Sequence, residues 1–260
     1  MGALNIWNAC IIPSLLSNCS TWLGISVNTV KRLDDLQHLM VRTLLRLSSF
    51  TPLPALRGAL GLMGMKWRVW QEKVLLVVAI MGLGEDTLAR QVLEEQVAQG
   101  YPGLAKEVSH ICMEIGLPNV CIGGVSKREV KAAIASHHLK VLKEEMEGKV
   151  KCAELLGCDL SKPQPYFSSK CLSKARMGFR IQTRMVICPG NMKQKFRGKM
   201  ECEDCMAWRE EGELEVTATQ SHLTGCPAYS TLRVGRDIGG NYSDLIDYFT
   251  ELMTVRAIGA

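Results

Sequence analysis

Four residues in the last quarter of the chain have the types and spacing of metal ligands. Cys202 and Cys205 are separated by two residues, and His222 and Cys226 follow after a gap of sixteen, four positions apart. A Cys-x-x-Cys turn can hold one tetrahedral ion, and residues four apart share one face of a helix. Three thiolates and one imidazole leave no open position for a catalytic water. The sequence therefore predicts one structural Zn²⁺.

The alternative for this set is coincidence, because the chain contains 11 cysteines. The segment between the two pairs is polar and charged, which argues against a buried core as the reason for these cysteines. Thr219 precedes His222 at a position from which it can cap the helix. Seven other cysteines have no common spacing, which favours buried thiols in a reducing, intracellular compartment: Cys10, Cys19, Cys112, Cys121, Cys152, Cys158 and Cys171.

A strongly basic stretch precedes the predicted zinc site. Ten lysine and arginine residues and no acidic residue occur in 162–199, whereas the rest of the chain has a net charge of −5. Arg176, Arg180 and Arg184 recur every four residues, so on a helix they repel one another unless a polyanion neutralises them. The predicted nucleic-acid-binding residues are Lys170, Lys174, Arg176, Arg180, Arg184, Lys193, Lys195, Phe196, Arg197 and Lys199.

Two other interpretations of the basic stretch remain open. It can be a solvated basic face, or it can complement the acidic helices in the middle of the chain. Phe196 can stack on a base, but a single phenylalanine also commonly anchors a loop to its own domain.

The elements that must position these residues are helices. Apolar residues recur every three or four positions, which predicts a mainly α fold with only isolated strand candidates, such as residues 215–217. The expected helices are 4–19 with a weak point at Pro13, 28–47, a short helix ending at Gly61, 66–81, 85–99, 102–115 and 126–156. Two prolines mark the main linker at residues 161–165. We expect three parts: an apolar helical segment (1–84), a charged helical connector (85–160), and a part (161–260) with the basic stretch, the zinc module and a final helix.

The first thirty residues carry no charge, which raises the question of a membrane or signal segment. The first basic residue is Lys31, so the positive start of a signal peptide is missing. Asparagine, serine, threonine and proline interrupt the apolar residues too often for a spanning helix, and we expect no membrane partner. The segment is instead expected to be buried, in part by structure that this chain lacks.

No residue pattern predicts catalysis. Asp34 and Asp35 are adjacent near a helix start, where carboxylates complement the helix dipole. His137 and His138 point in different directions on a helix and have no acidic partner arranged for catalysis, and no histidine is placed to activate Cys188. Phosphate-binding and serine-hydrolase motifs are absent from the sequence. We therefore expect that the protein is not an enzyme.

Short motifs around the predicted zinc ligands carry a family resemblance. They are Arg184-Met185, Asn191-Met192-Lys193, the Cys202/Cys205 pair, Thr219-Gln220-Ser221-His222-Leu223, Cys226-Pro227-Ala228-Tyr229 and Leu232-Arg233. Together they resemble the carboxy-terminal zinc knuckle of LINE-like, non-long-terminal-repeat retrotransposon reverse transcriptases. The beginning of the chain resembles the helical thumb and connector of the same family, through Ile12-Pro13-Ser14-Leu15-Leu16, Leu36-Gln37, Arg42, Leu44-Leu45, Thr51-Pro52, Ala55-Leu56 and Gly61-Leu62. The middle of the chain resembles nothing that we recognise.

The resemblance implies a nucleic-acid-binding C-terminal fragment with thumb-like helices in 1–84. Polymerase chemistry in that family depends on a Tyr-x-Asp-Asp turn in a palm domain, and Leu33-Asp34-Asp35 lacks the tyrosine. The implied partners are RNA or DNA and a palm-bearing polymerase segment that packs on residues 1–30. The implied location is intracellular, in the nucleus. The alternatives are a helical, zinc-stabilised adaptor that binds acidic proteins and, third, an active reverse transcriptase.

Overall fold

The computed structural model describes residues 5–48, 51–168, 171–183, 220–226 and 229–258. In these ranges the regular structure consists of twelve α-helices with short 3₁₀ and π turns, and no strand is present. The prediction of a mainly α fold is therefore confirmed, while the strand candidate at residues 215–217 lies outside the described ranges. No helix in the described part of the chain is long and apolar enough to span a membrane.

The chain forms two compact units. Unit 1 contains Met1–Glu147 and Asp159–Pro163, and unit 2 contains Gly148–Cys158 and Gln164–Ala260. The residues expected as a thumb-like segment thus share unit 1 with most of the expected connector. The last passage from unit 1 to unit 2 falls within the predicted linker, between Pro163 and Gln164.

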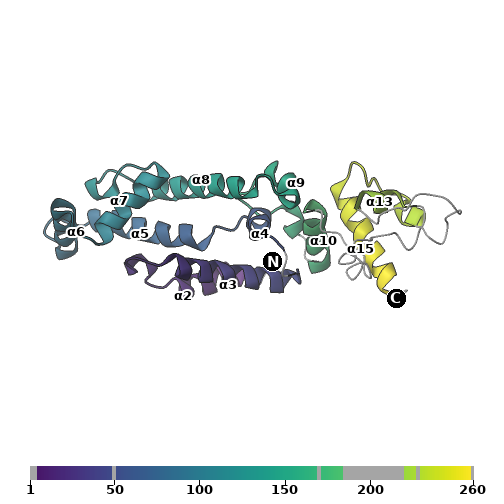
Figure 1. Ribbon diagram of the computed structural model, residues 1–260, viewed down its shortest axis with the longest axis horizontal. Helices are drawn as coiled ribbons and strands as arrows, with labels where there is room; N and C mark the ends of the chain where they lie inside the picture. Colours follow the sequence, from purple (N-terminus) through teal and green to yellow (C-terminus); the bar gives the residue numbers. More distant parts are fainter. Residues whose placement is uncertain (1–4, 49–50, 169–170, 184–219, 227–228, 259–260) are drawn as a thin grey trace. The chain divides into compact units, whose positions relative to one another are not determined.

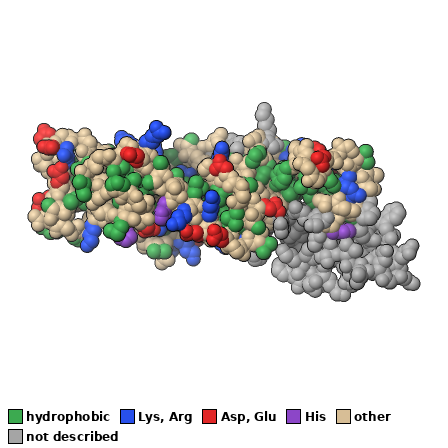
Figure 2. All heavy atoms as spheres, turned by 90° about the horizontal axis from the view of Figure 1, so that it is seen from above, with side chains coloured by type: hydrophobic (Ala, Val, Ile, Leu, Met, Phe, Trp, Pro, Cys, Tyr) green, Lys and Arg blue, Asp and Glu red, His purple; other side chains and the backbone are tan. Residues whose placement is uncertain are grey.

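Helix α5 (Met65–Met81) is the central helix of unit 1, and its neighbours α3 (Val27–Leu45), α7 (Leu104–Ile115) and α8 (Lys127–Met146) are visible around it in Figure 1. Its apolar residues enter one core with α7 and α8, in which Val74, Val108 and Ile134 are fully buried. Two further helices of the unit are α4 (Leu53–Leu60) and α6 (Leu88–Gln99). Acidic side chains gather at the α6 end of unit 1 in Figure 2.

Part of the uncharged beginning of the chain is covered by α5. Trp7 and Cys19 are buried in a cluster with Met65 and Val69, together with residues of the π turn Trp7–Ile11, helix α2 (Ile12–Leu15) and the 3₁₀ turn Cys19–Thr21. The expected helix 4–19 is thus divided, since Pro13 has no N–H for the regular hydrogen bond and Asn18 is left-handed at φ 57°. Four large apolar residues of the uncharged beginning remain exposed: Ile6 (58%), Ile11 (43%), Leu23 (58%) and Val27 (84%).

Helix boundaries follow local capping signals. Ser26, rather than the expected Asn28, caps α3 by accepting a hydrogen bond from Thr29 N at 3.1 Å. Helix α4 ends at Gly61, as predicted, in the left-handed region at φ 61°. A Cβ at Gly61 would lie 2.6 Å from the Cα of Lys162, so only glycine lets the segment 159–163 pass so close to α4.

The expectation of one helix over residues 126–156 is wrong. Helix α8 begins with a capping box between Ser126 and Glu129, but it stops at Met146. Gly148 follows with φ 73°, a conformation that cannot continue a right-handed helix. The rest of the segment forms the 3₁₀ turn Val150–Cys152 and the short helix α9 (Ala153–Leu156), and both belong to unit 2.

A polar network lies at the amino end of α5. Asp34 of α3 accepts hydrogen bonds from the guanidinium of Arg57 and from Met65 N, the latter at 2.9 Å. Asp34 thus complements the dipole of α5 and not, as expected, that of its own helix. His138 of α8 accepts from the N–H of Gly64 at 3.4 Å, so the backbone donors of Gly64 and Met65 at this helix start both have side-chain partners.

His138 is expected to make unit 1 sensitive to acid. Burial, with the nearby charges of Arg57 and Arg68, lowers the pKa of His138 from 6.5 to about 4. Between these values the unfolded chain binds more protons at this site than the folded chain, so stability rises with pH. Lowering the pH from 6.5 to 4 should therefore reduce the free energy of unfolding by about 3 kcal/mol through His138.

The measurement is urea unfolding of the full chain across this pH range. His138→Gln should remove that part of the pH dependence, whereas the neighbouring variant His137→Gln should retain it. An unchanged slope in His138→Gln would contradict the assignment.

Unit 2 is built on the packing of α10 (Leu172–Gln182) against α15 (Tyr242–Ile258). The 3₁₀ turn Pro165–Ser168 packs on α10, with Phe167 almost fully buried. Two shorter helices, α13 (Gln220–Gly225) and α14 (Ser230–Arg233), complete the described part of the unit.

Candidate metal and nucleic-acid site

Helix α13 places two of the four predicted zinc ligands on one turn. His222 lies within α13, and Cys226 follows directly after its last residue. Between them, Leu223 is fully buried, and its carbonyl accepts a hydrogen bond from the Tyr248 hydroxyl at 2.5 Å. The carbonyl of Cys226 accepts from Arg233 Nη1 at 2.7 Å. Helices α14 and α15 thus fix the turn that carries both predicted ligands.

The two described ligands have properties that suit zinc. His222 is half-buried, and burial lowers its pKa, which favours the neutral imidazole that binds metals. Cys226 is fully buried. The other two ligands, Cys202 and Cys205, and the expected cap Thr219 lie outside the described residues. Within the described ranges no three His, Cys, Asp or Glu side chains form a metal-binding group, and these ranges include only half of the predicted set.

Helix α10 brings together two of the predicted nucleic-acid-binding arginines. Arg176 and Arg180 lie one turn apart and are both half-buried. Burial is the main cause that lowers the pKa of Arg180, and the positive charge of Arg176 is the second. The expected repulsion between the two arginines is therefore present. Among the residues that the structure describes, no carboxylate forms an ion pair with either guanidinium.

Lys174 differs from these arginines because it has an internal partner. Its ammonium lies 2.7 Å from the carboxylate of Asp247 on α15, and this contact raises the pKa of Lys174. One interpretation of the basic stretch was that acidic residues of the same chain neutralise it, and this ion pair is one such contact. Its acidic partner lies in the last helix and not in the middle of the chain. The remaining predicted residues lie outside the described ranges: Lys170, Arg184, Lys193, Lys195, Phe196, Arg197 and Lys199.

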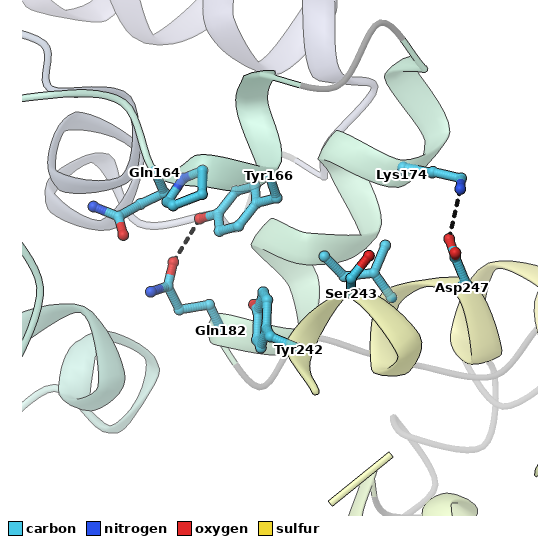
Figure 3. A pocket seen from close by; sticks show the side chains of 9 residues that line it. Gln164, Tyr166, Lys174, Gln182, Tyr242, Ser243 and Asp247 are labelled. Carbon is cyan, nitrogen blue, oxygen red and sulfur yellow. Dashed lines mark hydrogen bonds and ion pairs between the residues drawn. The ribbon is translucent and has the colours of Figure 1, made fainter. Parts of the chain in front are cut away.

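The sequence did not predict a cavity of about 620 Å³ in unit 2, shown in Figure 3. We call it the tyrosine pocket, and its lining includes Gln164, Tyr166, Gln182, Tyr242, Ser243 and Ile246. Three separate segments build it: the turn before α10, α10 itself and the first turn of α15. The only sequence signal was the aromatic pair Tyr166-Phe167, which directly follows the two prolines that predicted a linker.

Hydrogen bonds hold the two tyrosines of the pocket in place. The Tyr166 hydroxyl donates to Gln182 Oε1 at 2.6 Å, and the Tyr242 hydroxyl donates to the carbonyl of Gly178 at 2.7 Å. A Cβ at Gly178 would lie 2.5 Å from Tyr166 Cγ, so this glycine lets the ring pack directly on α10. Burial raises the pKa of both phenols, which therefore stay neutral.

Comparison of the chain with protein-family models, with curated proteins and with solved structures finds no match. The function must therefore be inferred from the residues of the chain itself. The features available are the basic stretch with its arginine pair on α10, the His222/Cys226 turn and the tyrosine pocket.

Proposed function

We propose that the chain is a nucleic-acid-binding segment related to the C-terminal region of LINE-like retrotransposon reverse transcriptases, without the polymerase active site. The observation that carries the proposal is the stretch 162–199, which holds ten basic residues and no acidic one. Its described part includes Arg176 and Arg180, one turn apart on α10. Two half-buried guanidinium groups without a carboxylate partner in the described ranges favour a phosphate ligand, since arginine binds phosphate through paired hydrogen bonds.

One structural zinc ion, held by Cys202, Cys205, His222 and Cys226, is part of the proposal. Two lines of support are the sequence spacing and the placement of His222 and Cys226 on a single turn. When bound, the ion would cross-link the end of the basic stretch to α13. The residues themselves would fill its coordination shell, so its role is structural.

A palm-bearing polymerase segment is the proposed protein partner of residues 1–30. Trp7, Ile12 and Leu16 of this segment are buried in a cluster with residues of α5, so these three side chains are not available to a partner. Ile6, Ile11, Leu23 and Val27 provide exposed apolar contacts there. The nucleus is the proposed location, because it is where such a partner and its nucleic acid would meet.

Reversing the charge of the arginine pair should weaken nucleic-acid binding. We expect the double variant Arg176→Glu/Arg180→Glu to bind single-stranded RNA and DNA at least about tenfold more weakly at low salt. Because each lost phosphate contact on a single strand removes about 0.7 from the slope of log affinity against log salt, the slope should decrease by about 1.4. Filter binding over about 50 to 200 mM salt measures both quantities.

The matched control is Lys127→Glu/Lys131→Glu on α8, which changes the net charge equally at two exposed positions four apart. This control should bind nearly as tightly as the unchanged chain. Absence of binding by the unchanged chain at low salt would rule out the proposed function.

The second candidate function is a zinc-stabilised adaptor for acidic proteins. The Lys174–Asp247 ion pair favours it, because it shows α10 binding a carboxylate. Under this alternative, Arg176→Glu/Arg180→Glu would leave nucleic-acid binding intact and abolish binding of an acidic peptide.

A further inference from the structure

We propose that the tyrosine pocket binds a single nucleobase of a nucleic-acid strand. The inference rests on the proposed function and adds to it a site for a base, where the basic stretch supplies contacts only for phosphates. It is carried by the size of the pocket, by a fixed and partly exposed aromatic ring in its lining and by a buried amide in its wall.

The pocket has room for a base and a surface on which to stack it. Its volume of about 620 Å³ is in the usual range of small-molecule sites. The Tyr242 side chain lines the pocket and is 40% exposed, while its hydroxyl is tied to Gly178. The ring is therefore held in one orientation before any ligand arrives. Every base has a π face, so such a ring stacks bases with little regard to sequence.

The wall of the pocket offers polar groups that match the edge of a base. Gln182 is 8% exposed, and its amide accepts from Tyr166 and donates from Nε2 to Cys158 Sγ at 3.2 Å. A primary amide has two N–H donors, so one remains for a ligand, and the Tyr166 oxygen keeps an acceptor lone pair. Ile246 supplies an apolar surface beside them. An aromatic face with a few placed donors and acceptors is the pattern that recognises unstacked bases.

Charge indicates that the base, and not the phosphate, enters. Figure 3 shows the Tyr166–Gln182 hydrogen bond on one side of the lining and the Lys174–Asp247 ion pair on the other. Because Lys174 is neutralised by Asp247, the lining presents no net positive charge to a phosphate. Lys174 and Gln182 share one face of α10, whereas Arg176 and Arg180 face away from it. Base and phosphate contacts can therefore be disrupted separately.

The test compares normal and abasic single strands of equal length and charge, bound to the full chain. The normal strand should bind about 5- to 150-fold more tightly, the contribution of stacking one base on an aromatic ring. Tyr242→Ala should remove this difference, because it should weaken the binding of the normal strand and leave the binding of the abasic strand unchanged. Tyr242→Phe keeps the stacking ring but loses its hydrogen bond to Gly178, so it should retain most of the difference. Arg176→Glu/Arg180→Glu should weaken the binding of both strands alike.

Ser243→Leu guards against a folding defect in Tyr242→Ala, because it fills the pocket from an exposed position without removing any packing. It should also abolish the preference for the normal strand. Equal binding of normal and abasic strands by the unchanged chain would overturn this inference and leave the proposed function standing. Failure to bind either strand would instead overturn the proposed function.

Discussion

Replacing Cys226 with serine is expected to reduce the zinc content of the purified chain from about one equivalent to almost none. A serine hydroxyl is a far weaker zinc ligand than a thiolate. A structural zinc site that keeps only three protein ligands has an incomplete tetrahedral coordination shell. Structural zinc contributes roughly 10 kcal/mol or more to the folding of small modules. The cooperative unfolding of unit 2 should therefore be lost as well. Metal analysis and thermal unfolding, with and without a chelator, measure the two effects.

Cys152→Ser is the matched control. Cys152 belongs to unit 2 and is as fully buried as Cys226, so both substitutions place a hydroxyl in an apolar site. Burial raises the pKa of the Cys152 thiol, which suits a neutral side chain in the core and not a metal ligand. This variant should lose some stability but keep its zinc. Full zinc content in Cys226→Ser would contradict the proposed ligand set, and so would loss of zinc in Cys152→Ser.

Helical periodicity predicted most of the fold because it is a local property. The expected helix 66–81 agrees with α5 to within one residue, and the expected end at Gly61 is correct, since glycine tolerates the left-handed conformation there. The error in 126–156 came from following charge pattern past Gly148, a helix-ending signal already present in the sequence. Packing between segments that are far apart in the sequence has no local signal of this kind.

The uncharged beginning of the chain shows the same limit. Its composition indicated burial, which holds for Trp7, Ile12, Leu16 and Cys19 but not for the segment as a whole. Composition also does not say which surface provides the cover. Trp7 and Cys19 are covered by α5, which follows about fifty residues later in the chain. Ile6, Ile11, Leu23 and Val27 stay exposed and available to the partner that the sequence suggested.

For the candidate site, spacing rules predicted relations within a helix. Residues four apart do share a turn at Arg176 and Arg180, and at His222 and Cys226. Zinc and nucleic acid remain predictions. The tyrosine pocket could not be predicted, because Tyr166 and Tyr242 are brought within 6.2 Å, between ring centroids, only by the packing of α10 on α15.

Asp34→Ala is expected to lower the free energy of unfolding of unit 1 by about 3 kcal/mol. This is the lower end of the cost of removing one partner of a buried ion pair, because the Asp34 side chain is 21% exposed. The sequence does not distinguish Asp34 from Asp35, because both are aspartates on the same helix. Asp34 holds the guanidinium of Arg57, which is only 8% exposed, and also the first N–H of α5. Without it both groups stay buried with one partner fewer. Denaturant unfolding followed by tryptophan fluorescence reports on unit 1, because Trp7 and Trp67 lie in its core.

Asp35→Ala is the matched control, because Asp35 is exposed on the same helix and should change stability by no more than about 0.5 kcal/mol. A double variant, Asp34→Ala/Arg57→Met, removes both charges and should recover part of the loss, since a buried charge without its partner costs more than an apolar pair. Equal effects of Asp34→Ala and Asp35→Ala would mean that both acids act only through the dipole of their own helix. Unequal effects would establish that α5, the helix on which unit 1 is built, is fixed at its amino end by a residue of α3.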